Sequence, residues 1–314
     1  MNDRFGREIT YLRLSVTDLC NLRCKYCMPA GGVNKRGHTD ILSIEEIEEI
    51  VGAAAQLGIT KVRITGGDPL VRRGIVEICR RVSATPGITE TCVTTNGALL
   101  RGFAVPLRKA GVSRLNISLD TLNPVRYREI TRIGELSDTL DGIKAAREAG
   151  FDSIKINAVL MRGENDNEIR ELANLTRDTS THVRFIELMP IGSMAEWSRE
   201  RYLENSAVLR AVPELMPTEN DGVATMYKLP DAIGSVGLIS PISSHFCPSC
   251  NRVRITADGM LKPCLHSADE VSLRGLSGDE LRDAMRAAIF AKPRRHHVDE
   301  AVSDSARDMF AIGG

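Results

Sequence analysis

Three cysteines near the start of the chain, Cys20, Cys24 and Cys27, lie in one short segment with the spacing Cys-x3-Cys-x2-Cys. Cysteine thiolates are the usual ligands of a 4Fe-4S cube, and three of them leave one of the four irons without a protein ligand. That open iron is free to bind and activate a molecule that the protein does not supply. The spacing therefore predicts an iron-sulfur site that can do redox chemistry.

Two alternatives for this motif are a disulfide with a spare thiol and a structural zinc site. The N-terminal segment is polar and the chain has no apolar run long enough to span a bilayer, so we expect a cytoplasmic protein without a signal peptide. Disulfides are rare in the cytoplasm. Zinc usually takes a fourth Cys or His close by, and the nearest histidine, His38, lies outside the motif. The motif favours the cluster.

A second group of three cysteines, Cys247, Cys250 and Cys264, lies near the other end of the chain. The segment that carries them reads as a hairpin, with strands at 252–256 and 260–264 joined by a turn that contains glycine. An antiparallel hairpin of this length returns Cys264 to within reach of Cys250. Three thiols therefore converge a second time.

The register of this hairpin follows from its short turn. We expect Thr256 to pair with Met260, which places Arg252 opposite Cys264.

Histidines make zinc a closer competitor at the second site than at the first. Either His245 or His266 would complete a tetrahedral zinc site, and the spacing of the cysteines alone leaves zinc and a cluster equally open. The segment 294–297, which contains His296 and follows Pro293, is expected to be a solvated turn without a metal role.

Composition limits the classes of partner. The chain has 314 residues, of which 42% are hydrophobic, so it can bury a large core. Lys plus Arg and Asp plus Glu both number 41, which gives no overall cationic field. We therefore expect neither a nucleic acid nor a membrane as a partner, because both attract basic proteins. Any anion site must be a local arrangement of cations.

Short apolar runs alternate with amphipathic helices, which is typical of an α/β fold with a parallel sheet. One predicted helix spans 44–57, with Ser43 and Glu46 as a capping box and Gly58 after its end. The predicted strands are 11–17, 61–65, 91–95, 114–119, 153–159 and 182–188.

Alternate positions on most of these strands are polar, while the opposite positions are apolar as expected beneath helices. We therefore expect the strands to enclose a wet and partly cationic interior, although a sheet with one solvated face remains an alternative. The polar positions are Arg13, Ser15, Thr17, Lys61, Arg63, Thr65, Thr94, Asn96, Asn116, Ser118, Asp120, Lys155 and Asn157.

Ligands of wound α/β folds gather at the C-terminal ends of the strands. The first strand leads directly into the Cys20 loop, and the second ends in Gly66-Gly67-Asp68-Pro69. Paired glycines allow the backbone to approach a ligand closely, and Asp68 adds a carboxylate or its flanking carbonyl groups. Such a turn alone is a weak signal, but beside an open iron it is a candidate edge for binding an amine.

Together these features resemble the radical S-adenosylmethionine superfamily, whose motif has three cysteines in this spacing and an aromatic residue before the last one, here Tyr26. The resemblance implies a partial (β/α)6 TIM-like barrel. It also implies that the open iron binds S-adenosylmethionine and that its cleavage gives a 5'-deoxyadenosyl radical. The glycine turn of this superfamily usually ends in Glu, where this chain has Asp68.

The stretches 247–254 and 185–190 and the final Ile312-Gly313-Gly314 resemble the GTP 3',8-cyclase family, which begins molybdenum cofactor biosynthesis. The likeness runs along nearly the whole chain. It implies a lyase that holds two 4Fe-4S clusters and converts GTP to 3',8-cyclo-7,8-dihydroguanosine 5'-triphosphate. The cluster ligands implied are Cys20, Cys24, Cys27, Cys247, Cys250 and Cys264, with no further catalytic residue assigned. The implied contacts with S-adenosylmethionine are Tyr26, Gly67, Ser118 and Met189, and those with GTP are Arg13, Arg63, Thr94, Lys155, Arg252, Val253 and Arg254.

Further expectations follow from the same resemblance. They are a barrel domain at 1–190, a C-terminal region at 191–314 with the second cluster, a homodimer, an electron donor, and handover of the product to cyclic pyranopterin monophosphate synthase. The glycine tail would enter the site or remain a frayed end. Alternative functions are a peptide- or enzyme-maturing radical S-adenosylmethionine protein with an auxiliary cluster and a non-catalytic zinc-binding scaffold.

Overall fold

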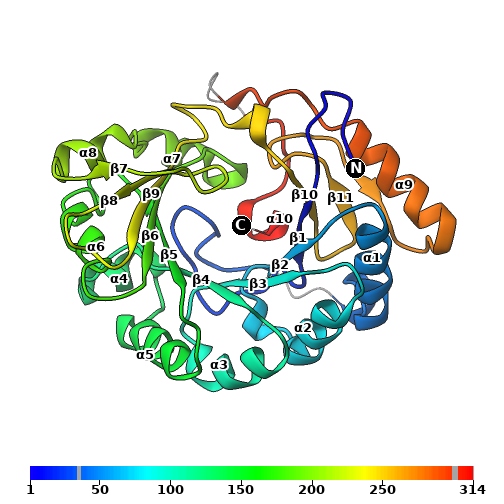
Figure 1. Cartoon of the computed structure of the whole chain (residues 1–314), viewed down its shortest axis with the longest axis horizontal. Coiled ribbons are helices and arrows are strands. Elements are labelled where there is room, and N and C mark those ends of the chain that lie inside the picture. Colours follow the sequence, from blue (N-terminus) through cyan, green and yellow to red (C-terminus); the bar gives the residue numbers. More distant parts are fainter. Residues whose placement is uncertain (34–36, 299–302, 314) are drawn as a thin grey trace.

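The computed structural model describes residues 1–33, 37–298 and 303–313. Six parallel strands lie side by side in chain order and form the centre of one curved sheet (Figure 1). The strands are β1 (Tyr11–Ser15), β2 (Lys61–Thr65), β3 (Glu90–Thr95), β4 (Arg114–Ser118), β5 (Ile154–Leu160) and β6 (His182–Glu187). They confirm the six predicted strands, with ends that differ by two residues at most.

Helices cover the outer, apolar face of this sheet, and the curved sheet surrounds the last described helix (Figure 1). The helices between the strands are α1 (Ile44–Gln56), α2 (Ile75–Ala84), α3 (Leu100–Lys109), α4 (Pro124–Thr131), α5 (Leu136–Glu148) and α6 (Ile169–Asn174). Those that follow β6 are α7 (Ala195–Glu200), α8 (Ser206–Ala211), α9 (Gly278–Phe290) and α10 (Met309–Ile312). Among the described residues, no helix is long and apolar enough to cross a membrane.

The capping box predicted for α1 is confirmed. The Ser43 hydroxyl accepts a hydrogen bond of 3.1 Å from the Glu46 amide, and the Glu46 carboxylate accepts one of 2.7 Å from the Ser43 amide. These bonds satisfy two backbone donors that an uncapped helix start leaves without partners. After the helix, Gly58 has φ +93°, a left-handed conformation that glycine adopts without strain.

Strands of the C-terminal part extend the sheet at both of its edges. One set is β7 (Met216–Pro217), β8 (Thr225–Lys228) and β9 (Ser235–Ile239), and the other is β10 (Arg252–Ile255), β11 (Met260–Lys262) and β12 (Val271–Ser272). Strand β9 pairs in parallel with β6, and β10 pairs in parallel with β1. The resulting sheet of the described residues has twelve strands. Segments that are distant in the sequence therefore close in on the same interior.

The alternation of polar and apolar positions is confirmed as the difference between the two faces of the sheet. Leu12 and Leu14 on β1 are fully buried under the helices. On the inner face, Arg63 and Lys155 are only 7% and 5% exposed, although both are charged. A solvated face would leave such side chains in water, so this alternative is excluded.

The predicted hairpin of the second cysteine motif is confirmed with its register. Arg254 lies opposite Lys262, and the Thr256 amide donates to the Met260 carbonyl at 2.9 Å. Gly259 has φ +83° in the turn, which a residue with a side chain adopts only with strain.

Candidate functional site

A single cavity of about 410 Å³ lies inside the curved sheet and reaches both cysteine motifs. Cys20, Cys24 and Cys27 line one side of it, and Cys247, Cys250 and Cys264 line another. All six are free thiols. The fold therefore joins two motifs that are more than two hundred residues apart in the sequence.

The glycine turn after β2 holds the first cysteine loop in place. The Gly67 amide donates to the Thr17 carbonyl at 2.8 Å, and the Asp68 amide donates to the Leu19 carbonyl at 2.8 Å. A Cβ atom on Gly67 would lie 2.4 Å from the Leu19 oxygen, far inside van der Waals contact. Glycine is therefore required because the turn and the loop touch backbone to backbone.

The Asp68 carboxylate does not face the cavity. It is 2% exposed and accepts hydrogen bonds from the Thr95 hydroxyl at 2.8 Å, the Asn96 amide at 2.7 Å and the Leu70 amide at 2.9 Å. Burial raises the pKa of Asp68 to about 6, and these hydrogen bonds counteract the shift. The side chain joins the ends of β2 and β3, and the backbone of the turn is left as the edge that faces a ligand.

The thiols of the first motif are arranged as metal ligands rather than as isolated side chains. Burial raises the pKa of Cys20 to about 11 and that of Cys27 to about 12. Burial also raises the pKa of Cys24, and the charges of Cys27 and Cys20 raise it further. Raised pKa values keep these thiols neutral at pH 7, and a bound cation would favour their thiolate forms instead. The motif therefore fits a metal cluster that stabilises the thiolates.

All four residues that the resemblance assigns to S-adenosylmethionine line the cavity: Tyr26, Gly67, Ser118 and Met189. The Tyr26 hydroxyl donates to Asp120 at 2.8 Å, and the other oxygen of Asp120 accepts from the Val159 amide at 2.8 Å.

The second motif lies against basic side chains. Burial opposes ionisation of Cys250, but the charges of Lys292 and Arg252 outweigh it and lower the pKa of Cys250 to about 6. Burial raises the pKa of Cys247, and the charges of Cys264 and Cys250 contribute to the same shift. The three thiols therefore lie near enough to act on one another and line the same cavity, so this motif also fits a metal cluster.

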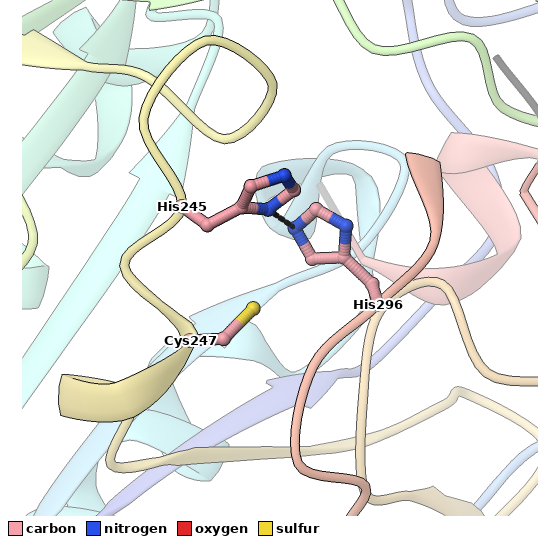
Figure 2. Close-up of side chains that lie close together, drawn as sticks. All are labelled: His245, Cys247 and His296. Carbon is pink, nitrogen blue, oxygen red and sulfur yellow. Dashed lines mark hydrogen bonds between the residues drawn. The ribbon is translucent and has the colours of Figure 1, made fainter. Parts of the chain in front are cut away.

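Two histidines, His245 and His296, lie close to Cys247, as Figure 2 shows. The ligand atoms of His245, Cys247 and His296 all lie within 4.8 Å of one another, and His245 Nδ1 is 3.4 Å from His296 Nε2. The His266 ring lies 4.7 Å from the His296 ring. The two histidines that the sequence offers to zinc are thus close to this site.

The expectation of a solvated turn at 294–297 is wrong for His296, which is 7% exposed. The guanidinium group of Arg7 explains the error. It donates to the carbonyl groups of Pro293 and Arg294 at 2.7 and 3.1 Å and to that of Cys247 at 2.9 Å. This contact ties the segment to the second cysteine motif, and no local sequence pattern signals it.

Basic residues dominate the lining of the cavity. Eleven arginines and lysines line it, but only three carboxylates do among the residues that the structure describes. The basic residues are Arg7, Arg13, Lys61, Arg63, Arg114, Lys155, Arg184, Arg252, Arg254, Lys292 and Arg295, and the acidic ones are Asp120, Glu187 and Asp221. The interior is therefore strongly electropositive in a chain with no net charge.

The positive charges lower one another's pKa values. Burial and the charge of Arg254 hold the pKa of Arg13 well below its usual range. Burial and the charge of Arg252 lower the pKa of Arg254 to about 10, and burial and the charge of Arg184 lower that of Lys155 to about 8. A bound anion would relieve this repulsion, so the cavity is suited to a highly charged anion.

Six of the seven residues that the resemblance assigns to GTP line the cavity, namely Arg13, Arg63, Thr94, Lys155, Arg252 and Arg254. Arg63 donates to the Tyr11 hydroxyl and, at 3.1 Å, to the Thr94 hydroxyl. The side chain of the seventh residue, Val253, is 1% exposed and lies in the apolar core.

The C-terminal segment reaches the cavity, a point that the sequence left open: Met309 and Phe310 line the cavity, and Gly313 contacts residues of its wall. Arg254 donates a hydrogen bond of 2.6 Å to the Gly313 carbonyl, and a Cβ atom on Gly313 would lie 2.8 Å from Thr65 on β2. Gly314 lies outside the described residues.

Other cavity residues were missed by the sequence argument. Arg184 lies on the inner face of β6, so the alternation of polar and apolar residues that predicted Lys155 as an interior residue predicts Arg184 as well. Asp221 lies in a turn and carried no signal. Within the described part of the chain, Asn116 Oδ1, Asn157 Oδ1 and Arg184 Nε are buried without a hydrogen bond. Buried polar atoms of this kind point to a polar ligand.

Comparisons with known proteins agree with this geometry. The family model of the radical SAM superfamily matches residues 14–176, and that described as Molybdenum Cofactor Synthesis C matches residues 181–298. The GTP 3',8-cyclases of Alkaliphilus oremlandii (strain OhILAs) and Alkaliphilus metalliredigens (strain QYMF) are each 48% identical to the chain over 320 residues, with 100% of both chains covered.

Among solved structures, Streptococcus suis SuiB has a TM-score of 0.63 and 18% identity, over 89% of this chain and 68% of SuiB, which is a likeness of fold. The identity to the curated relatives extends over the whole chain and includes both regions that the family models match. The chain therefore belongs to the GTP 3',8-cyclase family of the radical SAM superfamily.

Proposed function

We propose that this chain converts GTP into 3',8-cyclo-7,8-dihydroguanosine 5'-triphosphate, the first step of molybdenum cofactor biosynthesis. The observation that carries the proposal is a single cavity bounded by two groups of three thiols, with a wall of buried arginines and lysines between them. Arginine and lysine bind phosphate oxygens through charge-assisted hydrogen bonds. A nucleoside triphosphate thus matches the charge of this wall.

At one side of the cavity, Cys20, Cys24 and Cys27 would hold a 4Fe-4S cluster. Once bound, the cluster and S-adenosylmethionine supply the abstraction of a hydrogen atom from C3' of the GTP ribose. The chain's part is to bind and orient the cofactor through Tyr26 and Gly67, with Ser118 and Met189 as the other proposed contacts. The Asp120 carboxylate supports this role because it fixes the hydroxyl of Tyr26 at 2.8 Å.

On the wall of the cavity, Arg13, Arg63, Thr94 and Lys155 would hold GTP. They lie on four different strands, so their spacing is set by the sheet and not by a mobile loop. Four groups on rigid strands can fix the triphosphate and ribose in one orientation. This supports a binding role for the whole group.

At the other side, Cys247, Cys250 and Cys264 would hold the second 4Fe-4S cluster, and three cysteines would leave one of its irons without a cysteine ligand. Arg252, Val253 and Arg254 follow Cys250 on β10 and are the proposed contacts for GTP at this side, Val253 through its backbone. The electron-rich guanine edge is the part of GTP that suits an open metal site.

Holding GTP at both ends would serve the cyclisation directly. The bond to be formed joins two carbons of the same molecule, C3' of the ribose and C8 of guanine. A nucleotide in solution rarely bends so that these atoms meet, and restricting it to the bent form contributes to the rate. The buried, tail-covered cavity would also exclude water from the reacting carbons.

Several partners are proposed on the resemblance alone. They are an electron donor, a second copy of the chain in a homodimer, and cyclic pyranopterin monophosphate synthase as recipient of the product. We also propose a functional division near residue 190, with the first cluster on the barrel side and the second on the C-terminal side.

The test of this function is anaerobic reconstitution with iron and sulfide, followed by incubation with S-adenosylmethionine, GTP and a strong reductant. We expect 5'-deoxyadenosine and the cyclised nucleotide in equal amounts. Absence of 5'-deoxyadenosine would contradict the radical chemistry, and 5'-deoxyadenosine without cyclised nucleotide would contradict GTP as the substrate. Zinc without acid-labile sulfide would support the scaffold alternative instead.

A further inference from the structure

The carboxylate of Asp221 enters the cavity from a turn and contacts two cations that lie on neighbouring strands. Its Oδ2 accepts a hydrogen bond of 2.6 Å from Lys155 Nζ on β5, and the same oxygen pairs with Arg184 on β6. The side chains of Lys155 and Arg184 are 6% and 11% exposed, whereas that of Asp221 is 53% exposed. Two buried cations therefore share one carboxylate that reaches them from the solvent side.

The two other carboxylates that line the cavity, Asp120 and Glu187, accept hydrogen bonds from groups other than the cavity cations. Asp120 accepts from the Tyr26 hydroxyl and a backbone amide. Glu187 accepts from three backbone amides at 3.0 to 3.2 Å. Among the described residues that line the cavity, Asp221 is thus the carboxylate that pairs with Lys155 and Arg184. Glu90, which is not part of the lining, pairs with Lys61 at 2.8 Å and with Arg114.

The turn that carries Asp221 lies outside the core of the protein. Residues 216–222 are exposed, and the turn lies at the tip of the β7–β8 extension, outside the six central strands. The turn is closed locally, because the Asp221 amide donates to the Ala224 carbonyl at 3.2 Å and Gly222 has φ +63°. At its base, the Thr218 amide donates to the Met226 carbonyl at 2.8 Å. Withdrawal of the carboxylate therefore requires the loss of its ion pairs but no unfolding.

The single carboxylate of Asp221 only partly offsets the two charges of Lys155 and Arg184. Partial burial opposes ionisation of Asp221, but Lys155 and Arg184 lower its pKa to about 2, so it is an anion at neutral pH. Arg114 also lies close enough for its charge to act on Asp221. A polyphosphate carries several charges and more acceptor oxygens than a carboxylate, so it offers Lys155 and Arg184 separate oxygens instead of one shared oxygen.

We propose that Asp221 is an internal competitor for the anion site of Lys155 and Arg184, displaced when substrate binds and restored when product leaves. That the displacing anion is the triphosphate of a nucleotide rests on the proposed function. A competitor of this kind lowers the apparent affinity by the fraction of molecules in which the site is already filled. Asp221 then weakens ground-state binding and promotes release, and takes no part in the chemistry.

The test uses the full chain with both clusters, and inorganic tripolyphosphate as the probe, in anaerobic titration calorimetry at fixed ionic strength. We expect Asp221→Asn to bind tripolyphosphate about tenfold more tightly than the unsubstituted protein, because the internal competitor is weakened. Glu219→Gln is the matched control, since Glu219 is exposed in the same turn and its substitution changes the net charge equally. It should leave the affinity unchanged.

Equal or weaker binding by Asp221→Asn would overturn the proposal, as would an equal gain in Glu219→Gln, which would indicate a general charge effect. A second measurement needs no variant: amide hydrogen exchange of residues 218–224 should quicken when tripolyphosphate binds, and unchanged or slower exchange would contradict displacement. In turnover, Asp221→Asn should lower the KM for GTP without raising kcat. If Asp221→Asn binds tripolyphosphate more tightly but the protein does not cyclise GTP, the proposed function is contradicted. The role of Asp221 as an internal competitor is then still supported.

Discussion

Arg254 on β10 donates a hydrogen bond of 2.6 Å to the carbonyl oxygen of Gly313, the last described residue of the chain. The bond brings the C-terminal tail into the cavity, against a cation that the proposed function assigns to GTP. Within the described part of the chain, cavity cations are thus already engaged by acceptors of the protein, among them the Gly313 carbonyl on Arg254 and the Asp221 carboxylate on Lys155 and Arg184. Substrate binding must rearrange at least part of this network.

Gly313→Ala should impair turnover of GTP by at least about tenfold while the protein stays folded. Gly313 has φ +84°, and an added Cβ would lie 2.8 Å from the Thr65 side chain and 3.0 Å from Ser15, so the tail must leave its position. The measurement is the rate of formation of cyclised nucleotide.

Gly275→Ala is the matched control for the tail, because Gly275 also has a positive φ, of +75°, but has nothing within 4 Å of an added Cβ. It should keep the rate of the unsubstituted protein. Equal rates for Gly313→Ala and Gly275→Ala would show that the position of the tail is irrelevant.

Binding of GTP should weaken as the pH rises through about 8. Burial and the charge of Arg184 lower the pKa of Lys155 to about 8. The side chain is therefore a charged ammonium group below that pH and a neutral amine above it. The other charged or titratable groups that act on it are Asp221, Arg114 and His182. A phosphate binds the charged form, so the affinity is highest below pH 8.

The measurement for Lys155 is the Kd of GTP between pH 7 and 9.5. Lys155→Arg should remove most of this dependence, because a guanidinium stays charged over the whole range. A Kd that rises equally in both proteins would assign the effect to another group.

Gly67→Ala should lose the first cluster and keep the second. The added Cβ would lie 2.4 Å from the Leu19 carbonyl and 2.6 Å from the Asp18 carbonyl, both in the backbone of the cysteine loop. Neither can yield without moving the loop, at a cost of about 1–3 kcal/mol. Iron analysis should give about four irons per chain instead of about eight.

Gly52→Ala, in α1 with open space around the added Cβ, should retain both clusters. A full complement of iron in Gly67→Ala would mean that the close backbone contact is not needed to assemble the site.

Much of the barrel could be predicted because its signals are local. The capping box of α1 and the alternation along β1 each depend on neighbouring residues, and both are confirmed. The alternate polar positions along the strands predicted the cationic interior from sequence alone. The same alternation continues on β6, where Arg184 faces the interior.

What could not be predicted depends on contacts between distant segments. The pairing of β9 with β6 and of β10 with β1 joins strands far apart in the chain. The burial of His296 depends on Arg7, and the tail is fixed by Arg254. Asp68 is a related case. The sequence predicts its turn, but it does not reveal the three donors that hold its carboxylate away from the cavity.

The central claim is that the two sets of three cysteines hold two clusters, and that these clusters have separate roles in one cavity. The most direct test is Cys264→Ala, compared with Cys79→Ala, whose thiol is fully buried in α2 and lies outside the cavity. After anaerobic reconstitution, both iron content and the products formed from S-adenosylmethionine and GTP are measured. We predict that Cys264→Ala retains about four irons and forms 5'-deoxyadenosine but no cyclised nucleotide, while Cys79→Ala retains about eight and forms both. Cyclised nucleotide at the unsubstituted rate from Cys264→Ala would contradict the account.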